Sequence, residues 1–471
     1  KWVFQWEIPV LMSSYELFII PNYEFAYSIK KSHDIPIEVK SDPGKILFKM
    51  TNIPGLRDED YMAAAKDYLQ QVTFQLSGLL DEFGKKKFAT TWKDMAADLI
   101  NERYFGVQLN KDLSNTSDLK ALCEKAKTPY DKMNVIYEYV RNGMGWNGVY
   151  SIYSNDGIKT AWDKKNGDAG DINLILINLL KANGIDVYPL LISAREHGKV
   201  DTSYPFRQQF NKVIAFVQLN DKKYYLDGVN KVTPLGIIPF EFLNTKGFIV
   251  DKKKSALITI SDDSKQYKDI INIAGKIDAS GAIQGEATIM NYDYSRITKV
   301  NNFKTDINKY KEFYAKMYTN CKLDSFNVSG FNADTVPLTE SFKLTSSLNK
   351  TGNYYMLNYN LFTGLNKNPF VTERRFSNID FGCLHSCLLN EIISISDNLL
   401  VESLPKSTIL KTPDNSMVLT RIIEKDNNNI RILIKLNITR AEYNSGEYDI
   451  VKGFYKQMID FLDEPVVLKS K

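Results

Sequence analysis

The chain has 471 residues, of which 44% are hydrophobic, 12% aromatic and 25% charged. These proportions exclude a fibrous or disordered chain, and at roughly 150 residues per domain the length corresponds to about three domains. Sixty basic residues against 56 acidic ones leave a net charge of only +4. This balance argues against nucleic acid as a partner.

Cysteine content and apolar runs limit the class of protein further. Cys123, Cys321, Cys383 and Cys387 are too few for a disulfide framework. No run approaches the ~18 apolar residues that a membrane span requires, so we expect no span in this segment. Residues 1–6 alternate like a strand already under way, with neither an initiator Met nor a signal pattern. We therefore expect a fragment or a processed chain.

Residues 1–60 are expected to form the C-terminal part of an N-terminal β domain. Short extended segments, such as 18–21 and 45–50, are separated there by the Pro-Gly pairs at 43–44 and 54–55.

Helical signals begin near residue 90. The cap-forming residues Thr91 and Asp94 predict a helix that runs to about Arg103, and a second helix is predicted after Pro129. The buried face of this second helix is indicated by apolar residues at 3.6-residue spacing, which are Met133, Ile136, Tyr137 and Val140.

The clearest element is a helix over residues 168–184. Asp171 stands near its N-terminal end, 172–180 is almost entirely apolar, and Asn183-Gly184 is a typical stop signal. Apolar residues on nearly every side predict a buried helix.

An antiparallel sheet is predicted to follow this helix. Three strands are expected, over residues 185–193, 213–219 and 222–227. A buried helix packed on an antiparallel sheet defines an α+β fold, and we assign this core to residues 61–260.

Residues 261–471 are predicted to form a mainly β domain with helical insertions. Period-two alternation over 270–291 and 428–439 predicts strands, whereas the spacing over 306–319 and 448–462 predicts amphipathic helices.

The common cofactor and catalytic motifs are absent from the sequence. It contains no Gly-x-x-x-x-Gly-Lys-Ser/Thr phosphate-binding loop, no His-Glu-x-x-His and no Gly-x-Ser-x-Gly, and we expect no cofactor. The three histidines, His33, His197 and His385, are expected on the surface or in loops. Cys383, His385 and Cys387 fit no zinc spacing. We interpret the two cysteines as buried free thiols and expect no metal.

Three segments of the predicted core form a recognisable pattern. Residues 167–171 (Gly-Asp-Ala-Gly-Asp) open the buried helix, 210–214 (Phe-Asn-Lys-Val-Ile) begin one strand, and 225–227 (Tyr-Leu-Asp) end the next. This pattern resembles the transglutaminase-like superfamily, which carries Gly-Asp-Cys-x-Asp at the helix start, a His on one strand and an Asp at the end of the next. There the helix start lowers the pKa of the thiol, the His takes its proton and the Asp orients the imidazole. The resemblance implies a papain/transglutaminase-like core.

The chemistry of that family is missing from the matching positions. Ala169 stands where the nucleophilic Cys belongs and Lys212 where the His belongs, whereas Asp227 keeps its family identity. A methyl group cannot attack a carbonyl, and a lysine ammonium is no base. The resemblance therefore implies a degenerate triad with no catalytic residue. We expect the three residues to converge, with Lys212 ion-paired to Asp227.

The resemblance extends over nearly the whole chain. Trp146 matches an aromatic residue after the second core helix, and the segment from Pro189 through Arg195 to Asn211 resembles a variant found in large secreted proteins of Bacteroidetes type. In those proteins a β domain of unknown function precedes the core and another β domain follows it. The resemblance thus implies export to the periplasm or the cell surface.

Six residues are candidates for the lining of the former catalytic cleft. They are Trp146, Trp162, Asp168, Asp171, Arg195 and Asn211. The two aspartates equally suit a structural role, because carboxylates cap free N–H groups at a helix start. The two tryptophans equally suit the hydrophobic core.

From the resemblance we expect an inactive transglutaminase-like protein that binds or scaffolds, with an unidentified protein, peptide or glycan as its partner. One alternative is an active cysteine peptidase, amidase or protein cross-linking enzyme, for which Cys123 is the first thiol to test. A second alternative is a structural module that binds a protein or a surface glycan through its β domains.

Overall fold

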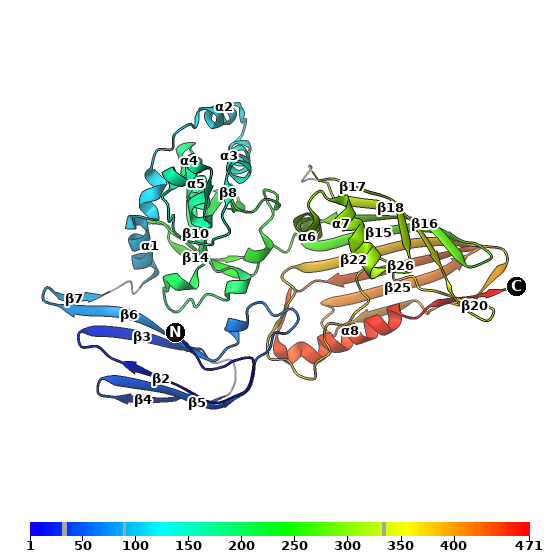
Figure 1. Cartoon of the computed structure of the whole chain (residues 1–471), viewed down its shortest axis with the longest axis horizontal. Helices are drawn as coiled ribbons and strands as arrows, with labels where there is room; N and C mark the ends of the chain where they lie inside the picture. Colours follow the sequence, from blue (N-terminus) through cyan, green and yellow to red (C-terminus); the bar gives the residue numbers. More distant parts are fainter. Residues whose placement is uncertain (31–34, 88–90, 332–335) are drawn as a thin grey trace. The chain divides into compact units, whose positions relative to one another are not determined.

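The computed structural model describes residues 1–30, 35–87, 91–331 and 336–471. The chain divides into two compact units, Lys1–Asp262 and Asp263–Lys471 (Figure 1). Each unit has a hydrophobic core of its own. Helices and several sheets are both present, which confirms the expected mixed α and β composition.

The first unit begins with two small antiparallel sheets, of order β1-β6-β3 with β7 paired to β6, and β2-β5-β4. Their strands are β1 (Trp2–Val3), β2 (Val10–Phe18), β3 (Tyr23–Lys30), β4 (Glu38–Asp42), β5 (Lys45–Ile53), β6 (Gln71–Asp81) and β7 (Gly84–Lys87). Phe4, Phe48, Ile53 and Val72 are fully buried in their core. β6 pairs with β1 and β3. The β region therefore continues past residue 60, where the sequence pattern suggested an end.

In the described residues, four α-helices precede the central helix of this unit. They are α1 (Trp92–Asn101), α2 (Ser117–Lys125), α3 (Pro129–Gly143) and α4 (Ile158–Lys164). Capping boxes begin α1, through Thr91 and Asp94, and α3, through Thr128 and Asp131. The four residues expected on the inner face of α3 are all buried. The sequence did not predict α2 and α4, because nine and seven residues contain too few apolar repeats.

The central helix α5 (Ala169–Ala182) is buried on all sides from Ala169 to Leu180. It packs on an antiparallel sheet of order β12-β11-β10-β13-β14. The strands are β10 (Val187–Ile192), β11 (Lys212–Leu219), β12 (Lys222–Leu226), β13 (Thr245–Ile249) and β14 (Ala256–Ile260). The helix and the first three strands lie where the sequence predicted them. A short parallel pair, β8 (Gly145–Trp146) with β9 (Asn166–Gly167), lies before α5.

The second unit is built on a sheet of order β17-β18-β16-β15-β22-β26-β25-β24. Its strands are β15 (Gln266–Ile277), β16 (Ala282–Tyr292), β17 (Lys322–Ser329), β18 (Leu338–Ser347), β22 (Leu384–Ile395), β24 (Thr408–Lys411), β25 (Met417–Asp426) and β26 (Asn429–Ile438). The central strands β15 and β22 are parallel, and their neighbours pair antiparallel. The predicted alternation over 270–291 corresponds to β15, a turn and β16.

A smaller sheet and three α-helices complete the second unit in its described residues. The sheet has the order β19-β20-β28-β23, with β19 (Asn349–Thr351), β20 (Tyr354–Leu357), β23 (Leu399–Ser403) and β28 (Val466–Ser470), and β21 (Ile379–Asp380) pairs with β27 (Glu442–Tyr443). The helices are α6 (Asp293–Phe303), α7 (Ile307–Met317) and α8 (Tyr448–Leu462). α8, which has the predicted bounds, runs along the large sheet (Figure 1). None of the helices in the described residues is both long and apolar enough to cross a membrane.

Candidate functional site

The start of α5 is fixed by two buried carboxylates. Asp168 accepts a hydrogen bond from the backbone N–H of Asp171 at 2.8 Å, and Asp171 accepts one from the N–H of Asp168 at 3.1 Å. Asn155 donates to Asp168 at 2.5 Å, and Ser154 donates to Asp171. Burial raises the pKa of Asp171, and the Ser154 hydrogen bond opposes this effect. Both aspartates therefore cap the helix that begins at Ala169, the structural role open to them from the sequence.

Two N–H groups converge on one carbonyl oxygen at this helix start. The pairing of β8 with β9 places Trp146 beside Gly167. The indole N–H of Trp146 donates to the backbone oxygen of Val149 at 3.0 Å. The backbone N–H of Ala169 donates to the same oxygen at 3.0 Å. The carbonyl group of Val149, in the loop after β8, therefore engages both N–H donors.

Lys212 is the first residue of β11 and is only 2% exposed. Its Nζ lies 2.7 Å from Oε1 of Glu241, and the two groups form an ion pair. The same Nζ lies 4.0 Å from the centre of the Tyr150 ring. Burial acts to lower the pKa of Lys212, but the carboxylates of Asp227 and Glu241 outweigh it, so the pKa is raised. Lys212 is therefore a cation at neutral pH.

Asp227 follows β12 directly and is completely buried. Its Oδ1 accepts hydrogen bonds from Nδ2 of Asn173 at 2.9 Å and from the N–H of Val229 at 3.1 Å. Its Oδ2 has no hydrogen-bond partner among the described residues. Asn173 lies one turn after Ala169 in α5, so it connects Asp227 to the helix.

The expected ion pair between Lys212 and Asp227 is wrong. Among the described residues, Lys212 forms its ion pair with Glu241, from the short 3-10 helix Phe240–Phe242. Asp227 is already held by Asn173 and by the backbone after β12, and it acts on Lys212 through the electrostatic field alone. We call Tyr150, Lys212, Asp227 and Glu241 the Lys212 cluster.

Neither Trp162 nor Asn211 contributes a side chain to the Lys212 cluster. Trp162 is 2% exposed, and its indole N–H donates to the backbone oxygen of Ser114 at 2.7 Å. It belongs to the core, not to a cleft. Asn211 accepts a hydrogen bond from the N–H of Ala194 at 3.0 Å. Its side chain therefore holds the connection between β10 and β11.

Arg195 lies at the edge of the Lys212 cluster. Its guanidinium stands over the ring of Phe240, 5.1 Å from the ring centre. Phe240 directly precedes Glu241 in the same short helix. Arg195 is therefore a neighbour of the ion-paired carboxylate, and Trp146 is a neighbour of the helix start.

Three residues that contact Lys212 or Asp227 escaped the sequence analysis. Asn173 had a usable signal, because it is one of two polar residues within the apolar run 172–180. Tyr150 and Glu241 gave no signal, since Tyr150 lies in a loop and Glu241 in a three-residue 3-10 helix, and their spacing to Lys212 carries no periodicity.

The histidines lie away from the Lys212 cluster or outside the described residues. His197 lies in a short 3-10 helix, with its Nδ1 3.0 Å from Oγ of Ser193. His385 stands on β22 and stacks on Tyr267, with 5.3 Å between the ring centres. The expectation of a loop or surface position was wrong for His385, because the alternation around it belongs to a strand. His33 is outside the described residues.

The thiols show no sign of activation. Cys123, Cys383 and Cys387 are buried and free, as predicted for the latter two. Burial raises the pKa of Cys123, opposed by Lys132, so its thiolate is disfavoured. In the described part of the chain, no group of three or more His, Cys, Asp or Glu side chains is arranged to hold a metal ion.

Residues 352–468 match the model of a domain of unknown function with a solved structure, DUF3858. The chain is also similar to the crystal structure of a candidate protease from Parabacteroides distasonis ATCC 8503, at 12% identity and a TM-score of 0.57, covering 99% of this chain and 74% of that one. At this identity the likeness shows the fold alone.

A second solved structure, of a candidate cysteine protease from Cytophaga hutchinsonii, shares 11% identity. The match covers 55% of this chain and 83% of that one, and its TM-score of 0.19 carries no argument about the fold. No curated protein matches the chain.

Proposed function

We propose that the chain is a transglutaminase-like protein with a degenerate triad, which binds or scaffolds instead of catalysing acyl transfer. The observation that carries the proposal is the start of α5. Ala169 occupies the first helical position, where a thiolate would be favoured, and offers only a methyl group. The fold shared with a candidate protease supports descent from an enzyme core.

The base position supports the same proposal. Lys212 is a cation paired with Glu241 in the field of Asp227, and a protonated amine cannot accept a proton from a nucleophile. The ion pair and the hydrogen bonds of Asp227 serve the stability of the core.

Two N–H donors at the helix start are already engaged by the chain itself. Acyl transfer needs N–H groups aimed at the position of a developing oxyanion. Here the N–H groups of Ala169 and Trp146 both donate to Val149. A substrate carbonyl would have to displace this loop first.

The proposed setting is bacterial and exported, at the periplasm or the cell surface, with an unidentified protein, peptide or glycan as partner. These parts of the proposal rest on the family resemblance of the core.

The test is an assay of the wild-type chain against glutamine peptides and amino-acid amides, with and without iodoacetamide. We expect no turnover above background. Turnover that iodoacetamide abolishes would overturn the proposal in favour of an active cysteine enzyme, and Cys123→Ser would then identify the thiol.

A further inference from the structure

A carboxyl group without a partner is buried in the centre of the eight-stranded sheet. Glu391 lies on β22 and is 1% exposed. Its neighbours across the strands are Ile273 on β15 and Ile432 on β26. Among the described residues, no hydrogen bond or ion pair reaches the carboxyl group of Glu391, and its Oε2 is shielded from solvent. Because buried acids are almost always paired, this one requires an explanation.

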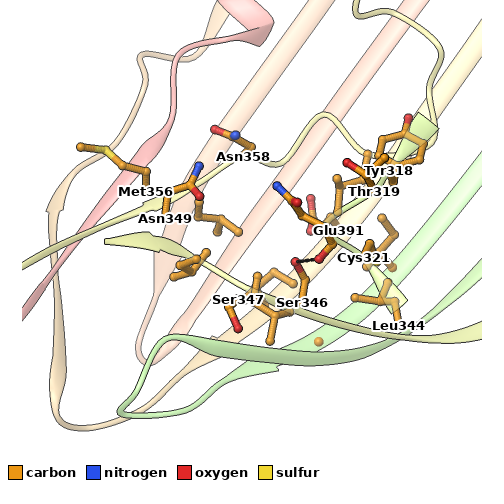
Figure 2. A pocket seen from close by; sticks show the side chains of 18 of the residues that line it. Tyr318, Thr319, Cys321, Leu344, Ser346, Ser347, Asn349, Met356, Asn358 and Glu391 are labelled. Carbon is orange, nitrogen blue, oxygen red and sulfur yellow. Dashed lines mark hydrogen bonds between the residues drawn. The ribbon is translucent and has the colours of Figure 1, made fainter. Parts of the chain in front are cut away.

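Glu391 lines a pocket of about 240 Å³ that lies within the second unit. Figure 2 shows it between Asn349 and Asn358 on one side and Tyr318 and Cys321 on the other. The walls near the sheet are aliphatic and include Ile273, Ile283, Leu344 and Ile393. The pocket therefore combines one buried acid with an apolar wall and a polar rim.

The sheet leaves room for this pocket through glycines. Gly275 on β15 pairs with Gly285 on β16, and on its other side it pairs with Ile393, two residues after Glu391. A Cβ atom added at Gly275 would lie only 2.8 Å from Cδ1 of Ile393. A larger residue at this position would occupy the space beside the acid.

We propose that this pocket binds a primary ammonium group at the end of an aliphatic chain, with Glu391 as its counter-ion. The apolar wall accepts the hydrocarbon chain, and the carboxylate accepts the N–H donors of the ammonium. A charge removed from water requires an opposite charge, and the described residues place no cation of the protein beside Glu391. The volume is below the roughly 300 Å³ at which pockets for drug-sized ligands begin. It suits a small alkylamine or one lysine side chain.

Proton release should accompany the binding. Burial raises the pKa of Glu391 to about 8, so the empty pocket holds a mainly neutral acid near pH 7. The other titratable groups lining the pocket are Tyr318 and Cys321, and burial raises both their pKa values, that of Tyr318 to about 12. Affinity for an ammonium ion should therefore rise with pH, by about fivefold between pH 7 and pH 8, because Glu391 must ionise.

The test is calorimetric titration of the full chain with n-butylamine hydrochloride at about pH 7 and about pH 8, in buffers of different ionisation enthalpy. We expect one site, a released proton, and at least about tenfold weaker binding by Glu391→Gln, which corresponds to ~1.4 kcal/mol. The control Glu424→Gln changes an exposed carboxylate of β25 and should leave binding unchanged.

A second variant tests the pocket without touching the acid. Ser347→Trp adds a large ring at the exposed rim and should weaken binding while circular dichroism stays that of the wild type. n-Butanol should bind less tightly than n-butylamine in the wild type and equally in Glu391→Gln.

A blocked pentapeptide with one central lysine distinguishes the two sources of the ammonium group. Tighter binding of the peptide than of n-butylamine would identify a protein lysine, and binding of n-butylamine alone would identify a free amine. The proposal is overturned if neither probe binds at millimolar concentration, or if Glu391→Gln binds as well as the wild type.

Discussion

Replacement of Lys212 should destabilise the first unit. Removing the ammonium group takes a cation away from the fully buried Asp227, and leaves Glu241, which is 35% exposed, without its ion-pair partner. We expect Lys212→Ala to lower the free energy of unfolding by about 3 kcal/mol, the lower range for breaking a buried pair. Urea denaturation measures this loss.

The matched control is Lys222→Ala on the neighbouring strand β12. Lys222 is exposed, and its replacement should change the free energy of unfolding by no more than about 0.5 kcal/mol. Equal effects of the two substitutions would show that Lys212 contributes nothing through its buried ion pair.

Glu391 should make the stability of the second unit depend on pH. Its pKa is about 8 in the folded protein, compared with about 4.3 for an unfolded chain. Between these values the folded state holds the proton more tightly. The contribution of Glu391 is therefore fully present below about pH 4.3 and is lost as pH rises to about 8.

Glu391→Gln removes this titration, since an amide does not ionise. The variant should gain stability relative to the wild type as pH rises through the same window, by an amount on the order of a few kcal/mol. Denaturation of both proteins across the window measures the difference. A difference that does not change with pH would show that Glu391 is ionised and solvated in the folded protein.

At the scale of elements, the second residue of α5, Gly170, is packed so closely that no side chain fits there. A Cβ atom at Gly170 would lie 2.0 Å from the backbone oxygen of Tyr153. Gly170→Ala should therefore lower the free energy of unfolding by about 3 kcal/mol, although alanine favours helices. In α8, Gly453 has nothing within 4 Å of an added Cβ. Gly453→Ala should raise the free energy of unfolding by about 0.5–1 kcal/mol. Thermal melting should therefore show a lower melting temperature for Gly170→Ala and a higher one for Gly453→Ala.

The loop that supplies Val149 should prevent simple restoration of catalysis. In the double variant Ala169→Cys/Lys212→His, a thiol and an imidazole return, but both N–H donors stay engaged with Val149. Residue 169 is also only 1% exposed, so alkylation by iodoacetamide should be slow. We expect no turnover of amide substrates. Iodoacetamide-sensitive turnover by this variant would show that the loop moves away readily.

Sequence predicted elements where periodicity is strong and failed where contacts come from loops. The apolar run of α5 and the amphipathic spacing of α8 were sufficient to predict these two helices, because a helix that is buried on one or more faces carries a matching apolar pattern in its own residues. The partner of Lys212 was missed because Glu241 lies in a three-residue helix. Glu391 is visible in the sequence as an acid at an inward position of β22, but only the packing shows that nothing pairs with it.

At the scale of the whole molecule, each unit carries its own core, and this allows the second unit to be tested alone. The large core cluster of Asp263–Lys471 draws its buried side chains from residues 271–468, on both sheets, α7 and α8. A domain with a separate core is expected to fold by itself. We therefore predict that residues 263–471, expressed alone, unfold in one cooperative thermal transition.

The isolated unit should also keep the properties assigned to Glu391, because the pocket that this residue lines belongs entirely to the second unit. The difference in stability between Glu391→Gln and the wild type should show the same dependence on pH in the fragment as in the full chain. Calorimetry of both proteins across the same pH values provides the comparison. A fragment that aggregates or melts without cooperativity would mean that the second unit depends on residues 1–262 for its fold, in spite of its separate core.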